Sequence, residues 1–258
     1  MPMVSVALIL PVRNRKAYTS AILHQLSTQI AQSSADHTID VVVVDDGSTD
    51  GTVELISQTF TQVHLLQGDG ELWWTGAIAT GMSYVQRQLE TEYIVWLNDD
   101  ITLTDNFIPN LIQVCQSHLH QNVITGGIIC DQSHPDWIVF GGVIASRQIN
   151  NMRQFSDASV LKVDTLNGNI AVLPTHLITD IGLPNAERFR HYGGDYEYIC
   201  RAKVAGYTIQ LSSHLVATTN YSASDVIRYM PLVFQMMLSP TLTASWQTLH
   251  NLHRLKSP

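Results

Sequence analysis

The stretch VVVVDDGSTD, residues 41–50, is an apolar run that ends directly in two adjacent acids. A second stretch, YIVWLNDD at residues 93–100, repeats the arrangement. An unbroken apolar run bounded by turn residues is typical of a strand buried on both faces, as in a parallel sheet. Ligands of such sheets bind outside the carboxyl ends of the strands. Carboxylates gathered there repel one another unless a positive group lies between them, usually a divalent cation carrying a phosphate. A metal–nucleotide site at a sheet edge is therefore expected.

Length and composition limit the classes of protein. The 258 residues, 45% hydrophobic and 14% charged, suit one large α/β domain or a domain with a small appendage. A net charge of −8 without a Lys/Arg run argues against duplex nucleic acid as a partner. The cysteines, at 115, 130 and 200, are odd in number and show no CxxC spacing, which favours a reducing compartment and disfavours structural zinc.

Hydropathy indicates the cellular compartment that we expect for the protein. The apolar segment at residues 4–10 lacks a basic leader and runs into Pro11, so we interpret it as a first strand rather than a signal peptide. No stretch of 18 apolar residues occurs, so no membrane span is expected. We therefore expect a cytoplasmic protein, with contact to the inner face of the cell membrane left open.

Strand and helix patterns alternate over the first half of the chain. Strands are expected at 4–10, 39–44, 63–66 and 93–97, and helices at 17–31, 52–59, 76–88 and 105–118. Further strands are expected at 123–130, 137–143, 169–173 and 207–211, with helices at 195–205 and from about 223. This order predicts an α/β fold with a mostly parallel central sheet and helices on both faces.

The pattern also predicts how the chain is divided. We expect a nucleotide-binding half at 1–121, an acceptor-binding and catalytic half of the same domain at 122–222, and a helical tail at 223–258. The tail is apolar and weakly basic. It could touch a membrane, pack on the domain or pack on a second subunit in a homodimer, and packing on protein is favoured.

The turn after the first acid pair admits three functional interpretations. A calcium loop starting at Asp46 would need Glu at its twelfth position, where Ser57 stands. A phosphatase nucleophile loop would separate its two acids by one residue, and these acids are adjacent. We favour the third, a nucleotide-binding turn in which Asp45 and Asp46 accept hydrogen bonds from base or ribose. Asp50 can serve merely to cap the following helix.

Several motifs occur in a fixed order between residues 4 and 219. They are LPVRNR at 10–15, VVDDGSTDGT at 43–52, LNDD at 97–100, LNGN at 166–169, GGDYEYICRA at 193–202 and AGY at 205–207. Together they resemble the family 2 glycosyltransferases, which have a GT-A fold. The resemblance implies an inverting transfer of a hexosyl or deoxyhexosyl unit from a UDP- or dTDP-linked donor. The acceptor would be a hydroxyl of a glycan or lipid-linked molecule, as in cell-envelope polysaccharide biosynthesis.

The resemblance also implies a nucleotide and metal site. The nucleotide-binding residues would be Pro11, Arg13, Asn14, Asp45, Asp46, Asn98 and Asp99. Asn98-Asp99-Asp100 takes the place of the family's Asp-x-Asp motif, with Asn98 in place of the first acid, as in the rhamnosyltransferase-like branch. Asp100 would coordinate Mg²⁺ or Mn²⁺ bridging the diphosphate. Asp99 could instead be plainly solvated. No Lys or Arg lies nearby in sequence to neutralise these acids, so a metal is expected to do so.

On the acceptor side, Asp195 matches the family's catalytic acid. A carboxylate in a cleft can take the proton of an acceptor hydroxyl. Asp195 could instead only favour the helix N-terminus. The acceptor pocket would also involve Gly168, Asn169, His191, Gly194 and Glu197. Thr219 stands where family members often have a metal-binding His, with His214 as the nearest alternative.

Two adjacent tryptophans, Trp73 and Trp74, precede Gly76. Neighbouring side chains diverge, so one indole is expected to pack inward and the other to wall the donor or acceptor pocket. The alternative is that both belong to the core. The glycines at 68 and 70 would let this loop move and become ordered when donor binds.

One rival function comes from a different class. The chain could be a nucleotide- or glycan-binding protein that kept the fold without turnover, which Asn98, Gly194 and the missing His would suit. A dinucleotide oxidoreductase is disfavoured because no GxGxxG follows a strand, and a P-loop enzyme because no GK[ST] occurs.

Overall fold

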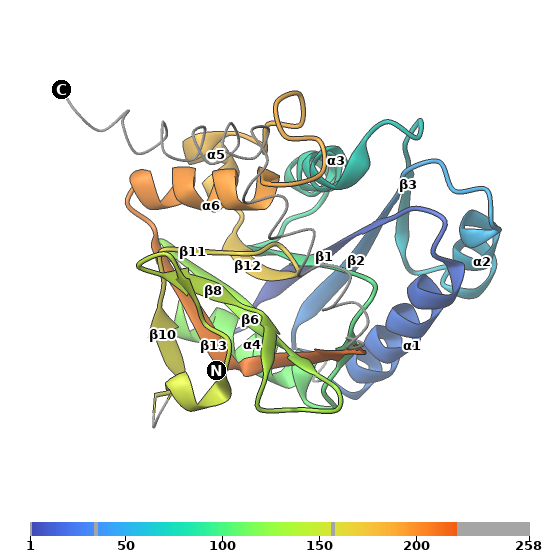
Figure 1. Cartoon of the computed structure of the whole chain (residues 1–258). Coiled ribbons are helices and arrows are strands. Elements are labelled where there is room, and N and C mark those ends of the chain that lie inside the picture. The colour runs from blue at the N-terminus through green and yellow to red at the C-terminus, as the bar shows by residue number, and fades with distance from the viewer. Residues whose placement is uncertain (1, 34–35, 156–157, 221–258) are drawn as a thin grey trace, which may run out of the picture. The chain divides into compact units, whose positions relative to one another are not determined.

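A mixed β-sheet runs through the molecule (Figure 1). The computed structural model describes residues 2–33, 36–155 and 158–220. Within them the strands of this sheet follow the order β10-β13-β6-β12-β4-β1-β2-β3, with β5 and β7 paired to β13 and β6. Their bounds are Ser5–Val12 (β1), Thr38–Asp45 (β2), His64–Gln67 (β3), Tyr93–Leu97 (β4), Thr102–Leu103 (β5), Val123–Asp131 (β6), Ile138–Phe140 (β7), Val160–Lys162 (β10), Ile170–Pro174 (β12) and Thr208–Thr219 (β13).

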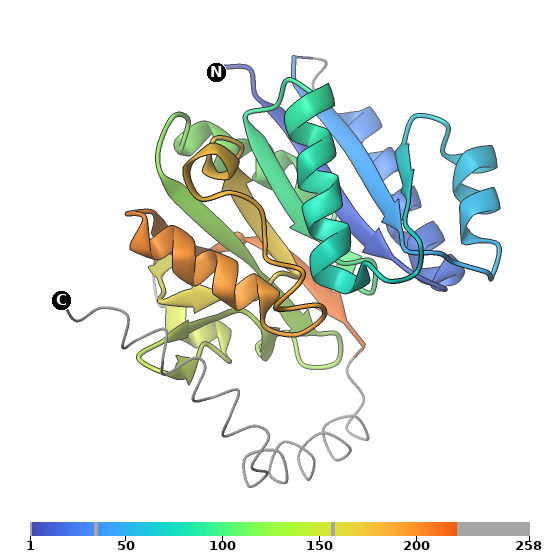
Figure 2. The ribbon, with the colours of Figure 1, turned by 90° about the horizontal axis from the view of Figure 1, so that it is seen from above.

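Helices cover both faces of the sheet (Figures 1 and 2). One face packs against α1 (Lys16–Gln32), α2 (Thr52–Thr59) and α4 (Phe107–Ser117), and the other against α3 (Trp73–Gln88), α5 (Leu177–Ile181) and α6 (Gly194–Val204). Strand β1 shows why its sequence is apolar throughout. Leu8 and Leu10 join the core under α1, whereas Ile9 joins the core under α3. The predicted fold class, a mostly parallel sheet with helices on both faces, is confirmed.

Strands from before and after residue 121 belong to one continuous sheet. β1 pairs in parallel with β2 and β4, β2 with β3, and β6 with β13. β12 lies antiparallel between β4 and β6, so β4 and β6 run the same way. The sheet therefore continues past residue 121 without a break, and the division into halves at that point stays a prediction. The tail at 223–258 lies outside the described residues.

Two predicted strands differ from the structure. The strand expected at 137–143 is wrong as one element: β7 joins the main sheet, and β8 (Gly142–Ile144) forms a small sheet with β9 (Arg147–Gln148) and β11 (Thr165–Leu166). The break falls at Gly141, whose carbonyl accepts hydrogen bonds from Asn167. A short 3-10 helix, Met152–Phe155, follows β9. β13 continues to Thr219 through a register shift between Leu211 and Val216, which the polar residues there conceal in the sequence.

Helix α3 begins at Trp73, three residues earlier than the expected start at Gly76. The loop between α5 and α6 passes beside this helix start (Figure 2), and the backbone N–H of Thr75 donates to the carbonyl of Arg190. In the part of the chain that the structure describes, no helix is both long and apolar enough to cross a bilayer.

Candidate functional site

The carboxyl ends of the parallel strands meet at one edge of the sheet. The polar segments that follow β1, β2 and β4 lie there, together with the residues before antiparallel β12 and the end of β13. These segments are 13–15, 45–46, 98–100, 167–169 and residue 219. The topology thus brings both acid pairs to the edge where α/β sheets bind ligands.

Asp46 has its carboxylate fully engaged with the backbone. Its Oδ1 accepts the N–H groups of Gly70 at 2.9 Å and Leu72 at 3.1 Å, and its Oδ2 accepts that of Trp73 at 2.8 Å. The side chain is 4% exposed, and Arg13 Nη1 lies 3.6 Å from Oδ2. Asp46 therefore holds the segment that leads into α3 and satisfies the N–H of Trp73, the first residue of that helix. Sequence analysis predicted ligand contact for Asp46 and did not predict this backbone role.

Asp45 keeps one unsatisfied oxygen. Its Oδ1 accepts the N–H of Ser48 at 2.8 Å, whereas its buried Oδ2 has no hydrogen-bond partner among the described residues. A buried polar atom without a partner costs free energy unless a ligand or water satisfies it. The turn beside it is held by Asn14, whose Oδ1 accepts the N–H of Thr49 at 2.7 Å. Asp45 is thus the acceptor at this edge that is suited to a base or ribose.

The second acid pair has a cation that sequence analysis missed. Arg15 Nε lies 2.9 Å from Asp99 Oδ1, and its Nη2 lies 3.1 Å from Asp100 Oδ2. Burial raises the pKa of Asp99 to about 6, and Arg15 opposes that shift. No Lys or Arg lies near these acids in the sequence, yet Arg15, 84 residues before Asp99, lies beside them because it follows the adjacent strand β1. The resemblance assigns Pro11, Arg13 and Asn14 of its motif, LPVRNR, to the nucleotide site and gives Arg15 no role.

Asp100 has the properties of a metal ligand. Its side chain is 45% exposed, so one carboxylate faces the edge from the solvent side. Among the described residues no three His, Cys, Asp or Glu side chains gather to form a complete protein cage. Mg²⁺ commonly uses one or two carboxylates and completes its shell with phosphate oxygens and water. A single exposed carboxylate therefore fits a cation that arrives with a diphosphate.

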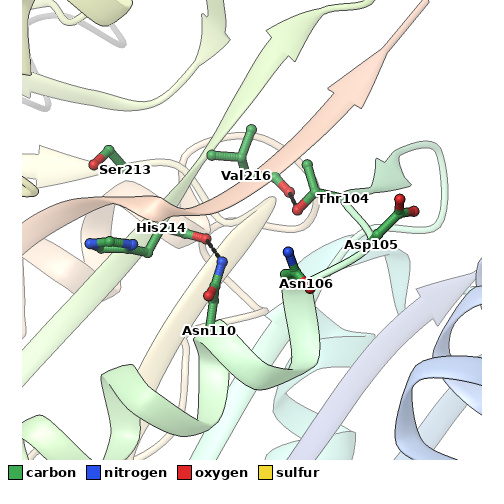
Figure 3. A pocket seen from close by; sticks show the side chains of 7 residues that line it. All are labelled: Thr104, Asp105, Asn106, Asn110, Ser213, His214 and Val216. Atoms are coloured by element: carbon green, nitrogen blue, oxygen red, sulfur yellow. Dashed lines mark hydrogen bonds between the residues drawn. The ribbon is translucent and has the colours of Figure 1, made fainter. Parts of the chain in front are cut away.

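His214, the alternative metal-binding histidine, does not lie beside Asp100. Thr219 Oγ1 donates to the backbone carbonyl of Asp100 at 3.4 Å, so the position where the family often has His does lie beside Asp100. His214 lies five residues earlier on β13, roughly 15 Å away at the rise of a strand. It lines a cavity of about 540 Å³ at the start of α4, together with Asn110 and Asp105 (Figure 3). Neither acid pair lines that cavity.

Asn98 links the nucleotide edge to the acceptor side. Its Oδ1 accepts the indole N–H of Trp74 at 2.9 Å, and its amide N–H donates to Asn169 Oδ1. A carboxylate at this position could not donate to Asn169. The departure from the family's acidic motif therefore has a structural use here, namely to orient Trp74 and Asn169.

Asp195 lies on the other side of that link. Its Oδ2 accepts the N–H of Gly168 at 2.9 Å and its Oδ1 that of Tyr196 at 2.8 Å. Burial raises the pKa of Asp195, and the backbone hydrogen bonds only partly offset this effect. A raised pKa together with a fixed orientation suits a general base.

Two glycines allow this close approach. A Cβ on Gly168 would lie 2.4 Å from the Trp74 ring, and one on Gly194 would lie 2.3 Å from Thr75 Oγ1. Gly194 replaces the family's usual Glu because α6 starts directly against α3 at this point. Thr75 Oγ1 is buried and has no hydrogen-bond partner among the described residues. Sequence analysis missed Thr75, whose only signal was its position beside the tryptophan pair.

The two indoles diverge as predicted. Trp74 is half-buried and meets Trp96 edge-on with ring centroids 5.6 Å apart. Trp73 is 44% exposed, has a φ of +56°, and lies 5.7 Å from the His191 ring. Such a backbone conformation is an outlier for a bulky residue and is held here by the Asp46 carboxylate. The interpretation with both indoles in the core is therefore wrong.

Glu197 differs from the other predicted acceptor residues. Its carboxylate binds Arg201 one turn later on α6, at 3.0 and 3.2 Å. Arg201 also donates to the carbonyls of Ile181 and Leu183, which close α5. Glu197 thus helps to hold α6 against α5, and a direct contact with an acceptor stays a prediction.

Comparison with known proteins agrees with this geometry. The model of the family described as "Glycosyl transferase family 2" matches residues 7–164. A search of curated proteins finds no match. Among solved structures, GalNAc-T7 with UDP, GalNAc and Mn²⁺ superimposes with a TM-score of 0.65 at 11% identity, over 86% of this chain and 45% of that one.

Two further structures have the same fold. S. aureus TarS 1-349 gives a TM-score of 0.58 at 16% identity, over 92% of this chain and 66% of that one. The mannosyltransferase PcManGT from Pyrobaculum calidifontis, in complex with GDP-Man and Mn²⁺, gives 0.59 at 14% identity, over 84% and 57%. The chain therefore spans between 45% and 66% of the length of these three proteins. The family model covers more than half of the sequence, and the chain belongs to glycosyl transferase family 2.

Proposed function

We propose that this protein is a metal-dependent, inverting glycosyltransferase that moves a sugar from a nucleoside diphosphate to an acceptor hydroxyl. One observation carries the proposal. The nucleotide edge, with Asp45 and Asp100, is joined through Asn98 and Trp74 to the buried carboxylate of Asp195. This chain of contacts through Asn98, Trp74 and Gly168 supports a single displacement, in which an acceptor hydroxyl beside Asp195 would attack the anomeric carbon as the diphosphate leaves.

The chain's own residues supply three parts of such a reaction. Asp45 would accept a hydrogen bond from base or ribose, and Asp100 would bind a divalent cation, Mg²⁺ or Mn²⁺. When bound, that cation stabilises the charge that develops on the leaving diphosphate. Asp195, held by the N–H groups of Gly168 and Tyr196, would take the proton of the acceptor hydroxyl as the oxygen attacks.

The finer specificity belongs to the same proposal. We expect a UDP- or dTDP-linked hexose or deoxyhexose as donor, and a glycan or lipid-linked acceptor. The structural relatives were solved with UDP and with GDP-Man, so relatives of this fold accept more than one base. Work at the inner face of the membrane and homodimer formation are proposed on sequence grounds alone. The exposed indole of Trp73 beside His191 would border the acceptor.

Release of the nucleoside diphosphate tests this function. The purified full-length chain should release UDP, dTDP or GDP from a panel of nucleotide-sugars in the presence of Mn²⁺, and EDTA should abolish the release. The Asp195→Asn variant should bind the donor and fail to turn it over. Donor binding without release by the wild-type chain, with or without an acceptor mixture, would instead identify a non-catalytic nucleotide-binding protein.

A further inference from the structure

Arg15 lies between two carboxylates that differ strongly in solvent exposure. Asp99, on the Nε side, is 4% exposed, and its second oxygen accepts the hydroxyl of Thr19 at 3.1 Å. Asp100, on the Nη2 side, is 45% exposed. Buried ion pairs with further hydrogen bonds are fixed in geometry, whereas exposed pairs are weak and readily exchanged. The Arg15 Nε pairs with a buried carboxylate by charge without a hydrogen bond of good geometry, and the Nη2 pairs with an exposed carboxylate that can change partner.

The position of the guanidinium is fixed by a third contact. Its Cζ lies 4.8 Å from the centroid of the Tyr18 ring, on the first turn of α1. Stacking on an aromatic ring and the charge pairing with Asp99 both persist if Asp100 lets go. The group would then present its Nη atoms at the edge where the diphosphate is expected. Guanidinium groups bind phosphate oxygens by paired hydrogen bonds, which an ammonium group cannot reproduce.

We propose that Arg15 is a ligand of the donor's diphosphate, which Asp100 releases when a divalent cation binds. This inference rests on the proposed function, because it needs a diphosphate at this edge. Asp100 exchanges one positive partner, the Arg15 Nη2, for another, the cation. The freed end of Arg15 would then bind diphosphate oxygens and stabilise negative charge on the leaving group. The Arg15 guanidinium and the divalent cation thus compete for Asp100 and together stabilise the diphosphate.

A purely structural Arg15 makes different predictions. If it only neutralises Asp99, its removal should lower the melting temperature and leave nucleotide affinity unchanged among molecules that remain folded. If it competes with the cation, its removal should strengthen the binding of Mn²⁺ alone. If it binds the diphosphate, its removal should weaken UDP more than UMP.

Calorimetry on the full-length chain separates these outcomes. Mn²⁺ is titrated without nucleotide, and UDP, dTDP, GDP and the matching monophosphates are titrated with saturating Mn²⁺. The variants are Arg15→Gln and Arg15→Lys, with Lys16→Gln as the matched control. Lys16 is the next residue, carries the same charge, and lies beside Gly51 away from the acid pair.

Arg15→Gln should bind Mn²⁺ alone about fivefold more tightly and the diphosphate about tenfold more weakly, with the monophosphate nearly unchanged. Arg15→Lys should keep the fold, restore little of the diphosphate affinity, and so guard against a misfolded Gln variant. Lys16→Gln should match the wild type. Unchanged diphosphate affinity in both Arg15 variants, or weaker Mn²⁺ binding in them, would overturn the inference. Absence of any diphosphate binding by the wild-type chain would instead remove the proposed function itself.

Discussion

The two acid pairs of this protein follow similar buried strands and are held by different kinds of partner. Asp46 binds three backbone N–H groups of the segment that leads into α3. Asp99 and Asp100 pair with one side chain, that of Arg15. Backbone donors are part of the fold, whereas a guanidinium side chain can give up its place beside a carboxylate to a metal ion. The first pair therefore shapes the site, and the second pair is suited to exchange ligands.

The largest effect is expected at Asp195, the candidate base. Asp195→Asn keeps the shape and one of the two backbone hydrogen bonds, to Gly168 or to Tyr196, and removes basicity, so turnover should fall by a factor on the order of 10²–10⁴. Donor affinity, measured by calorimetry, should persist. Loss of donor affinity with residual turnover would make Asp195 a binding residue.

The pH profile provides a second check on Asp195. Ordinary aspartate has a pKa of about 4. Because burial raises the pKa of the Asp195 carboxyl, kcat/KM should begin to fall on the acid side at a pH above that value. Below its raised pKa the group is protonated and cannot accept a proton, so the rate should fall about tenfold per pH unit. An acid limb at the ordinary aspartate pKa would contradict the assignment.

The next prediction compares how much each acid pair contributes to the free energy of unfolding. Asp46→Ala leaves three backbone N–H groups without their acceptor, which should cost about 3 kcal/mol in the free energy of unfolding. Urea denaturation followed by circular dichroism measures this. Asp46→Asn, which retains one acceptor oxygen, should lose less. A cost below about 0.5 kcal/mol, typical of an ordinary surface substitution, would show that Asp46 does not hold this segment.

Asp100→Ala should give the opposite pattern. Its half-exposed carboxylate contributes little to folding, so the free energy of unfolding should change by less than about 0.5 kcal/mol. Binding of a nucleoside diphosphate with Mn²⁺ should weaken by roughly 10- to 100-fold, the loss of one charged ligand. Unchanged affinity in the presence of Mn²⁺ would place the metal elsewhere.

The smallest effect concerns the two indoles beside the first pair. Donor addition should change tryptophan fluorescence, and the change should vanish in only one of Trp73→Phe and Trp74→Phe. Trp74 is fixed by Asn98 and Trp96, whereas Trp73 is exposed on a strained backbone, so we expect Trp73 to report the change. Equal loss of signal in both variants would contradict this difference.

Much of the fold follows from local patterns. The apolar runs at residues 41–44 and 93–97 predicted strands that are confirmed nearly to the residue, because a strand buried on both faces needs no partner-specific signal. The break at Gly141 and the extension of β13 to Thr219 were missed. Both depend on hydrogen bonds to distant segments, such as the one from Asn167 to the Gly141 carbonyl.

The candidate site divides in the same way. The acids were recognisable because each pair stands at the end of a buried strand, and the expectation that Trp73 and Trp74 diverge followed from backbone geometry. The partners of those acids were not recognisable. Arg15 reaches Asp99 only because β1 lies beside β4, and Asp46 reaches Trp73 only because the segment after β3 folds back over it. Long-range pairing of charges is a property of the fold and has no local sequence signal.

A crystal structure with UDP and Mn²⁺ tests the account most directly, because manganese can be located by its anomalous scattering. We expect a manganese peak within coordination distance of the Asp100 carboxylate, the diphosphate beside it, and Asp46 still bound to the backbone of Gly70, Leu72 and Trp73. A peak at the cavity lined by His214 and Asp105, or a nucleotide bound away from both acid pairs, would contradict it.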